Sequence, residues 1–185
     1  MRSSSRRPLS VRAARTAPGA GALALLLAAA LPAAELAVTG IDFAPAVNAK
    51  LEDYGEAEAA TLREAIATAV AHESECSGVP SGTGVTVTVE ELAPTRLTRK
   101  QLADNPSLDV VRSKSLGGAE LKGEVRDAQR RLLATVSYRY FAPTLPLGSA
   151  SRDPWADARL AIDGFAGKLA DACRKLPPPA HFASG

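Results

Sequence analysis

The stretch VTVTVE, residues 85–90, decides the fold class, because its apolar and polar side chains alternate strictly. A period of two residues is the pattern of a β-strand with one buried face and one face in water. Such a strand belongs to a sheet that is covered on one side only, with the valines on the covered face. We expect Thr86, Thr88, Lys122 and Glu124 on the polar face.

Further strands are predicted on both sides of this stretch. Residues 119–126 alternate in the same way, and the inward positions are Ala119, Leu121, Gly123 and Val125. Asp127-Ala128-Gln129-Arg130 predicts a hairpin turn, because Asp favours turn geometry. The return strand is expected from about Leu132 to Phe141, and a looser alternation predicts one more strand from Leu36 to Phe43.

Two amphipathic helices are predicted, one before and one after these downstream strands. The first runs over 56–75, after Asp53-Tyr54-Gly55-Glu56, which resembles a capping box, and it stops at Ser77-Gly78-Val79-Pro80. The second begins at Asp153-Pro154, an acidic N-cap followed by proline at the first helical position. The apolar stripes are Leu62, Ile66, Ala69, Val70 and Cys76 in the first helix, and Trp155, Ala158, Ile162, Phe165, Ala166, Leu169 and Cys173 in the second.

The predicted order of elements is therefore β-α-β-β-β-α. It indicates an α+β fold, a two-layer sandwich whose antiparallel-rich sheet carries two helices on one face. The connection from Ala93 to Gly118 is long, and Thr98 with Gln101 predicts one short capped helical turn that ends before Asn105-Pro106. Long connections in compact domains are often functional, so this one is a candidate binding surface.

Residues 1–34 are predicted to be a signal peptide. The segment has five arginines, no acidic residue, and the apolar stretch GAGALALLLAAAL at residues 19–31, followed by small residues. Thirteen helical residues span roughly 20 Å, less than the ~30 Å hydrocarbon core, so a permanent membrane span is the less favoured alternative. Arg6-Arg7 leaves twin-arginine export open. No cysteine precedes Cys76, so a lipoprotein anchor is not expected.

Cleavage after about Ala34 leaves a single domain, residues 35–176, and a tail, residues 177–185, that is predicted to be disordered. The whole chain has 22 basic and 20 acidic residues, and five of the basic ones lie in the leader. The remainder has 17 basic against 20 acidic residues, a net charge of −3. Nucleic-acid binding needs a basic face and is therefore not expected. Export predicts a periplasmic or secreted protein.

The two cysteines are predicted to form a disulfide, Cys76–Cys173. Each lies near the C-terminal end of a predicted helix, and two helices separated by three reversing strands run in the same direction. In an oxidising compartment such a pair closes a loop of 97 residues and stabilises the fold by about 4–5 kcal/mol. The alternative is two buried thiols. Redox activity is not expected, because the chain has no Cys-x-x-Cys motif.

No residue pattern predicts a catalytic or metal site. The chain has two histidines, His72 and His181, and their spacing from the cysteines fits no compact zinc pattern. Asp153 and Asp157 stand one helical turn apart, so a small hydrolase that uses these carboxylates is an alternative. Helix capping and the helix dipole explain the same two residues more simply. No cofactor is expected.

Residues 96–131 hold nine basic and five acidic residues. One hypothesis is that this segment faces lipid headgroups or an anionic cell-wall polymer. The alternative is an ordinary solvated face, which alternating charges on a strand commonly form.

Three short stretches carry a family resemblance. They are residues 85–92 before Ala93-Pro94, then Gly117-Gly118-Ala119-Glu120-Leu121 with Asp127 at the next turn, and Trp155-Ala156-Asp157-Ala158 leading into Phe165. Over roughly residues 85–170 the chain resembles the proteobacterial envelope family called domain of unknown function 3313. The resemblance implies a small secreted or lipid-anchored protein and carries over no catalytic residue. This chain departs from the family because it lacks the cysteine for lipidation.

The sequence thus favours a non-enzymatic periplasmic protein that acts as an accessory or binding module of the cell envelope, with an envelope protein or lipid as its partner. The alternatives are the hydrolase described above and a structural or stress-related secreted protein.

Overall fold

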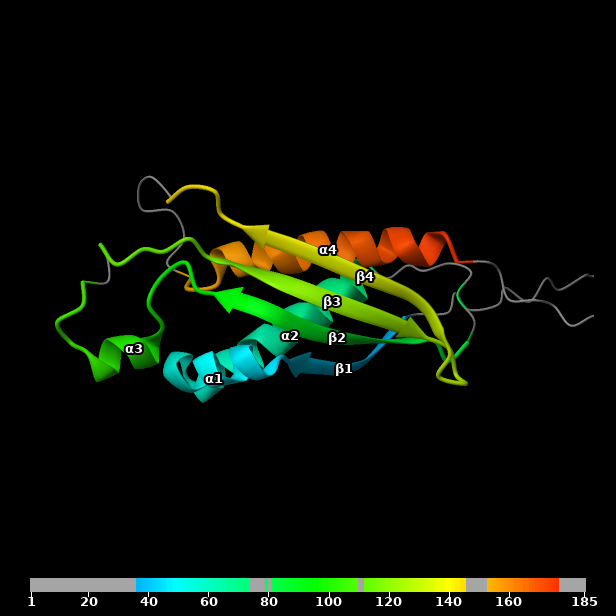
Figure 1. Cartoon of the computed structure of the whole chain (residues 1–185), viewed down its shortest axis with the longest axis horizontal. Coiled ribbons are helices and arrows are strands. Elements are labelled where there is room, and N and C mark those ends of the chain that lie inside the picture. Colours follow the sequence, from blue (N-terminus) through cyan, green and yellow to red (C-terminus); the bar gives the residue numbers. More distant parts are fainter. Residues whose placement is uncertain (1–35, 74–78, 80, 110–111, 146–152, 177–185) are drawn as a thin grey trace, which may run out of the picture. The chain divides into compact units, whose positions relative to one another are not determined.

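The computed structural model describes residues 36–73, 79, 81–109, 112–145 and 153–176. The predicted leader, Cys76 and the predicted tail lie outside these residues. The fold is α+β, as predicted. Its elements in chain order are β1 (Ala37–Phe43), α1 (Pro45–Tyr54), α2 (Glu56–Glu73), β2 (Gly84–Ala93), α3 (Arg99–Asp104), β3 (Gly118–Arg126), β4 (Leu132–Phe141) and α4 (Ala156–Arg174) (Figure 1).

The four strands form one open, mixed sheet in the order β1-β2-β3-β4. β1 pairs with β2 in parallel, whereas β2–β3 and β3–β4 are antiparallel. The prediction of an antiparallel-rich sheet is therefore confirmed. The predicted turn joins β3 to β4, since the Arg130 amide donates to the Asp127 carbonyl over 2.9 Å.

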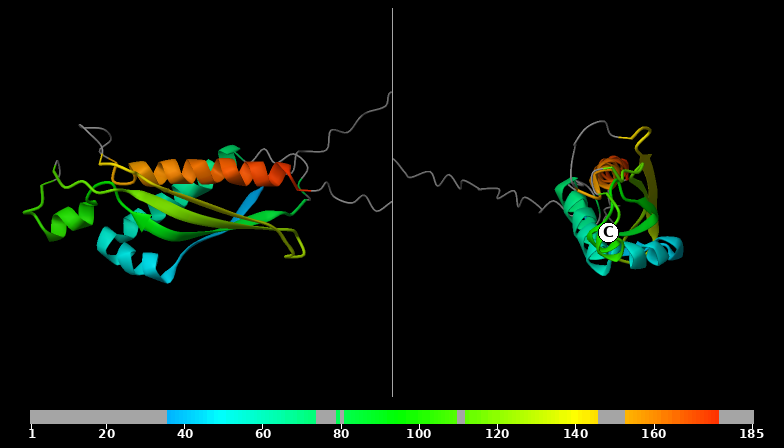
Figure 2. Two further views of the ribbon diagram at one scale, coloured as in Figure 1. Left: turned by 45° about the horizontal axis from the view of Figure 1, so that its top comes forward. Right: turned by 90° about the vertical axis from the view of Figure 1, so that its left-hand side faces the viewer.

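The valine face of β2 is the centre of the core. Val85, Val87 and Val89 are buried, and so are the predicted inward residues of β3. α4 packs against β3 and β4, and α2 contacts both α4 and β1 (Figure 2). Every predicted stripe residue of α4 is buried, and the same holds for Leu62, Ile66 and Val70 of α2. The two apolar stripes cover the valines, as the sequence pattern requires.

Glycines allow α4 to approach the strands closely. A Cβ atom at Gly123 in β3 would lie 2.7 Å from Cζ of Phe165, so the phenyl ring fills the place of a side chain. A Cβ atom at Gly164 in α4 would lie 2.5 Å from Cε1 of Tyr138. Each contact places an aromatic ring against a backbone, which closes the core without a void.

The opposite face of β2 and β3 is polar, as predicted. Glu124 accepts from Arg126 over 2.7 Å and lies 3.2 Å from Lys122. Arg139 on β4 bridges Glu91 at 3.0 Å and Glu120 at 3.2 Å. The charges on this face alternate and pair with one another, as on an ordinary solvated face.

The predicted order of elements lacks two helices, and the predicted capping box is wrong. Residues 45–52 of α1 carried no prediction, and Asp53, the predicted N-cap of the next helix, belongs to the last turn of α1. Gly55, with φ of 109°, separates α1 from α2, which begins at Glu56 as expected. The capped turn at Thr98 is confirmed and forms α3, since the Thr98 amide donates to Oε1 of Gln101 over 3.0 Å. None of the described helices is both long and apolar enough to span a membrane.

Candidate functional site

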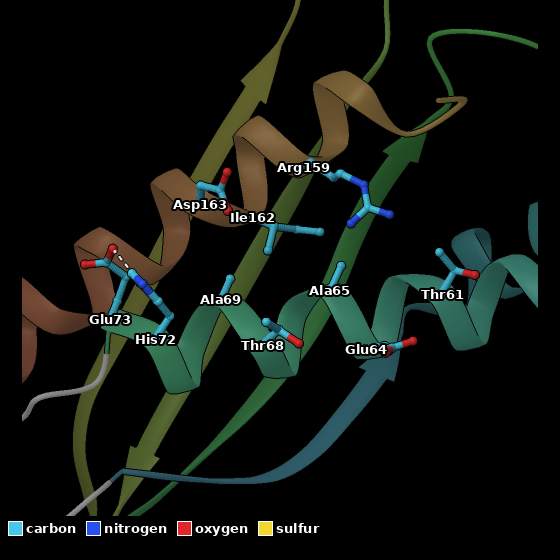
Figure 3. A pocket seen from close by; sticks show the side chains of 10 residues that line it. All are labelled: Thr61, Glu64, Ala65, Thr68, Ala69, His72, Glu73, Arg159, Ile162 and Asp163. Carbon is cyan, nitrogen blue, oxygen red and sulfur yellow. Dashed lines mark ion pairs between the residues drawn. The ribbon is translucent and has the colours of Figure 1, made fainter. Parts of the chain in front are cut away.

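A groove lies between α2 and α4, with a volume of about 810 Å³ (Figure 3). We call it the α2–α4 groove. Its volume falls within the range of small-molecule and peptide sites. Its lining residues are Thr61, Glu64, Ala65, Thr68, Ala69, His72 and Glu73 from α2, and Arg159, Ile162 and Asp163 from α4.

The groove exists because the side chains on the flank of α2 that faces α4 are small. The large apolar residues of this helix point to the sheet, and the flank that faces α4 carries Ala65 and Ala69 instead. Residues four apart lie above one another on a helix, so the two alanines leave a continuous shallow strip. In Figure 3, Ala65, Ala69 and Ile162 point into the space between the helices. The apolar floor is thus narrow, and the rim is polar.

The charges of the rim are mostly negative. Three carboxylates, those of Glu64, Glu73 and Asp163, line the groove. The guanidinium of Arg159 also lines the groove, and its charge is paired with Asp153, because its Nε lies 2.7 Å from Oδ2 of that residue. His72 is 84 % exposed, and its Nδ1 lies 3.6 Å from Glu73. The rim therefore offers acceptors to a cationic group or to a hydrogen-bond donor.

A buried contact fixes α2 to α4 beside the groove. The indole of Trp155 is 1 % exposed, and its Nε1 donates to Oε2 of Glu58 over 2.6 Å. The Tyr54 ring meets the indole edge-on, with centroids 5.5 Å apart. Burial raises the pKa of the Tyr54 hydroxyl, and the charge of Asp53 adds to the effect. The indole NH would be costly to bury without Glu58, so this contact holds the two helices at a defined spacing.

The structure gives Asp153 and Asp157 separate partners. Asp153 accepts from the Trp155 amide over 2.9 Å and pairs with Arg159, so it orders the turn that precedes α4. Asp157 accepts from the Thr95 hydroxyl over 2.8 Å. Neither carboxylate lines the α2–α4 groove. The geometry therefore gives each aspartate a structural role at the start of α4.

Thr95 anchors the long connection against the start of α4. Its amide donates to the Pro154 carbonyl over 2.7 Å, and its carbonyl accepts from the Ser115 amide over 3.0 Å. A Cβ atom at Gly117 would lie 2.4 Å from the Thr95 hydroxyl oxygen. The absence of a side chain at Gly117 thus permits this close packing.

The predicted disulfide falls partly outside the described residues, because Cys76 is not among them. Cys173 is buried at the C-terminal end of α4. α2 and α4 run in the same direction across the sheet (Figures 1 and 3), which is the arrangement on which the pairing was predicted. The pairing itself stays a prediction.

Within the part of the chain that the structure describes, no three His, Cys, Asp or Glu side chains are grouped to hold a metal ion. His181 lies outside that part. The basic residues of the segment 96–131 are spread over α3, the long connection, β3 and the hairpin turn. Several have acidic neighbours, namely Lys100 with Asp104, Arg112 with Asp109, and Arg131 with Asp127.

Comparisons with known proteins give only distant likenesses. No family model matches the chain, and no curated protein matches it. The fold is similar to that of a PelC dodecamer from Paraburkholderia phytofirmans, at a TM-score of 0.38 and 8 % identity, over 77 % of this chain and 91 % of that one. It is also similar to a minor lipoprotein from Acinetobacter baumannii, at a TM-score of 0.31 and 14 % identity, over 75 % and 95 %. Because both likenesses are this distant, neither the activity nor the assembly state of those proteins is inferred for this chain.

Proposed function

We propose that this protein is an exported, non-enzymatic accessory protein of the cell envelope that binds a partner in the α2–α4 groove. The observation that carries the proposal is the groove itself, which combines a narrow apolar floor with three carboxylates on its rim. Two helices fixed to each other by Trp155 and Glu58 form a preorganised surface, and a preorganised surface loses little entropy on binding. The predicted N-terminal leader supports the location, and the resemblance to domain of unknown function 3313 agrees with it.

The chemistry of the rim selects the class of partner. Glu64, Glu73 and Asp163 face the groove, whereas the charge of Arg159 is balanced by Asp153. A segment with lysine or arginine side chains finds acceptors there, and its apolar side chains contact the alanines of α2 and Ile162. The partner is accordingly a basic, partly apolar peptide segment of an envelope protein. Opposite charges across such an interface accelerate encounter and set the register.

Site-specific photocrosslinking in cells tests this proposal. A photoreactive residue at Thr68, which lines the groove, is compared with the same residue at Thr135, an exposed threonine of β4 outside it. We expect a defined crosslinked species in the envelope fraction from position 68 and not from position 135. We also expect Glu73→Lys to reduce its yield, because the substitution reverses one charge of the rim.

Two results would contradict the proposal. One is the same set of species from both positions, which would indicate random collision. The other is a crosslink from position 68 that Glu73→Lys leaves unchanged, which would remove the charge argument.

A further inference from the structure

A second hollow lies at the hairpin end of the sheet, on the polar face. Its volume is about 540 Å³, and six of the residues that line it are Thr39, Gly84, Thr86, Arg126, Asp127 and Arg130. We call it the hairpin cleft. Thr86 and Arg126 belong to the face opposite the buried Val85 and Val125, so the cleft is separate from the α2–α4 groove. Ligand binding in the hairpin cleft does not depend on the function proposed for that groove.

Glycines keep the hairpin cleft open. A Cβ atom at Gly84 would lie 2.3 Å from Cγ2 of Thr39, so any other residue there would displace the Thr39 side chain. Gly82 has φ of 80°, and a Cβ atom there would lie 3.0 Å from Cβ of Ala128 in the hairpin turn. The hairpin turn can therefore lie close to the start of β2, and the side chains of two arginines, at positions 126 and 130, form one wall.

Arg130 occupies the position of the hairpin turn that requires a positive φ, since the turn is closed by the bonds from the Arg130 amide to the Asp127 carbonyl and from the Asp127 amide to the Arg131 carbonyl. Its φ is 62°, and among the described residues it is the non-glycine residue with a positive φ. Hairpin turns favour glycine or asparagine at such a position, because a Cβ atom makes it strained. The side chain of Arg130 lines the cleft.

The charges around the cleft leave a positive excess at Arg130. Glu124 is shared by Lys122 and Arg126, and Arg131 lies 2.7 Å from Asp127. No ion pair within the described part of the chain involves Arg130. Nη1 of Arg126 donates to the Arg130 carbonyl over 3.0 Å, which holds the Arg126 side chain against the backbone of the turn.

The carboxylate of Asp127 does not repel an anion in the cleft. Its Oδ1 accepts from the amides of Gln129 and Arg131 over 2.9 and 2.8 Å, and its Oδ2 accepts from Nε of Arg131. Its side chain is 3 % exposed. Three donors therefore surround the carboxylate and shield its charge from the cleft.

The two threonines add a second kind of recognition. The Thr39 hydroxyl donates to the Val85 carbonyl over 3.1 Å, and the two threonine hydroxyl oxygens lie 3.1 Å apart. Because the Thr39 hydrogen is used, Thr86 donates to Thr39, and the Thr86 oxygen keeps a free lone pair. The cleft thus presents guanidinium donors next to a hydroxyl acceptor. A ligand that satisfies both carries an anionic group beside a hydroxyl group.

We propose that the hairpin cleft binds an anionic sugar. The phosphate or carboxylate of the sugar contacts the guanidinium of Arg130, and a sugar hydroxyl donates to Thr86. A planar guanidinium binds a phosphate or a carboxylate through two parallel hydrogen bonds. Arg130 therefore selects the anionic group of the ligand, and Thr86 selects a hydroxyl group next to it.

Calorimetric titration of the purified protein with glucose 6-phosphate, glucuronate, glucose and inorganic phosphate tests the proposal. We expect saturable binding of at least one anionic sugar, and binding of glucose and of inorganic phosphate at least about tenfold weaker. Arg130→Gly should weaken the anionic sugar at least about tenfold, because it removes a charged donor. The melting temperature of this variant should stay unchanged or rise, since glycine adopts positive φ without strain.

The matched control is Arg112→Gln, which removes an arginine that is 90 % exposed and does not line the cleft. Its affinity should equal that of the unmodified protein. Equal affinities for the unmodified protein and Arg130→Gly would overturn the proposal. So would the absence of saturable sugar binding below about 10 mM, or inorganic phosphate that binds as tightly as the sugars.

Discussion

At the scale of single residues, the side chain of Asp127 orders the turn between β3 and β4. Its carboxylate closes the β3–β4 turn with three hydrogen bonds and shapes one end of the hairpin cleft. Burial by itself raises the pKa of this carboxyl. The hydrogen bonds from the backbone and side chain of Arg131, and from the Gln129 amide, outweigh burial and lower the pKa below its usual value. The charged form is therefore the one that the folded state stabilises.

This lowered pKa predicts a pH dependence of stability. A carboxyl with a depressed pKa in the folded state stabilises the fold above its unfolded pKa of about 3.9, and the contribution disappears as the pH falls through the folded pKa. Asp127→Asn should therefore lower the free energy of unfolding at neutral pH. The difference from the unmodified protein should shrink on acidification from about pH 5 to about pH 2. Urea unfolding across this range measures both.

The comparison with Asp127→Asn isolates this residue, because Glu124 also has a lowered pKa, caused first by the hydrogen bond from Arg126. Both proteins share the titration of Glu124, so it cancels in the difference. A difference that stays constant with pH would show that the charge of Asp127 plays no part.

At the scale of elements, the packing of α4 on the sheet depends on glycines, because a residue without a side chain lets a neighbouring ring come close to the backbone. Gly164 faces the Tyr138 ring of β4, whereas Gly167, three residues further along the same helix, has nothing within 4 Å of the place of its Cβ. The two positions share a residue type and a helix, and they differ in what a methyl group would meet. They are therefore a matched pair for measuring the closeness of this contact.

We expect Gly164→Ala and Gly167→Ala to change stability in opposite directions. The alanine at 164 should destabilise the protein by about 1–3 kcal/mol, because Tyr138 must move out of its place. The alanine at 167 should stabilise it by about 0.5–1 kcal/mol through helix propensity alone. Urea unfolding measures both free energies. Equal effects of the two substitutions would contradict the close approach of α4 to β4.

The elements also show what the sequence can and cannot predict. Alternation identified β2 and β3, because one face of each is buried and the other is polar, and a looser alternation identified β1. The predicted hairpin turn identified β4 as the return strand. The helical stripe identified α2 and α4, because one side of each helix is buried. α1 has only Val47 and Leu51 as buried residues, a single pair four apart, and this is too weak a signal against its polar surroundings. Pro45 at its start and Gly55 after its end were the available evidence.

The α2–α4 groove was not predicted, and the reason is physical. The sequence pattern shows which residues face the core, but a groove depends on how two helices lie relative to each other. Ala65 carried no prediction of its own, and Ala69 was predicted to belong to the apolar stripe, whereas in the structure both line the groove beside α4. The long connection was the predicted place for a binding surface. The groove and the cleft instead lie against the regular elements, which hold them in place.

At the scale of the whole molecule, the predicted export and the predicted disulfide belong together. The predicted leader would direct the protein to an oxidising compartment, and the parallel course of α2 and α4 brings their C-terminal ends to the same end of the sheet. Cys173 is buried at that end, in the stripe that packs on the strands. An oxidising compartment and a common location are the two requirements for a structural disulfide.

Thiol titration of the denatured, unreduced protein tests the pairing of Cys76 with Cys173. Protein from the periplasm should show no reactive thiol before reduction and two after it. Loss of the bond should destabilise the fold by about 4–5 kcal/mol if the closed loop acts through chain entropy. The Cys76→Ser/Cys173→Ser double variant is the control for that measurement. Two reactive thiols before reduction would exclude the disulfide.

The order of the strands has a consequence for how the chain reaches its fold. Neighbours in the sheet are also neighbours in the sequence, from β1 through to β4. The β3–β4 hairpin closes through a short turn, and β2 then pairs with β3 across the connection that carries α3. Only the parallel pairing of β1 with β2 requires a crossover connection, which contains α1 and α2. The β3–β4 hairpin joins residues that are closest in the sequence, so we expect it to form first. The parallel pairing of β1, which joins Ala37 to Gly84, is expected to form last, because its loop-closure entropy is larger.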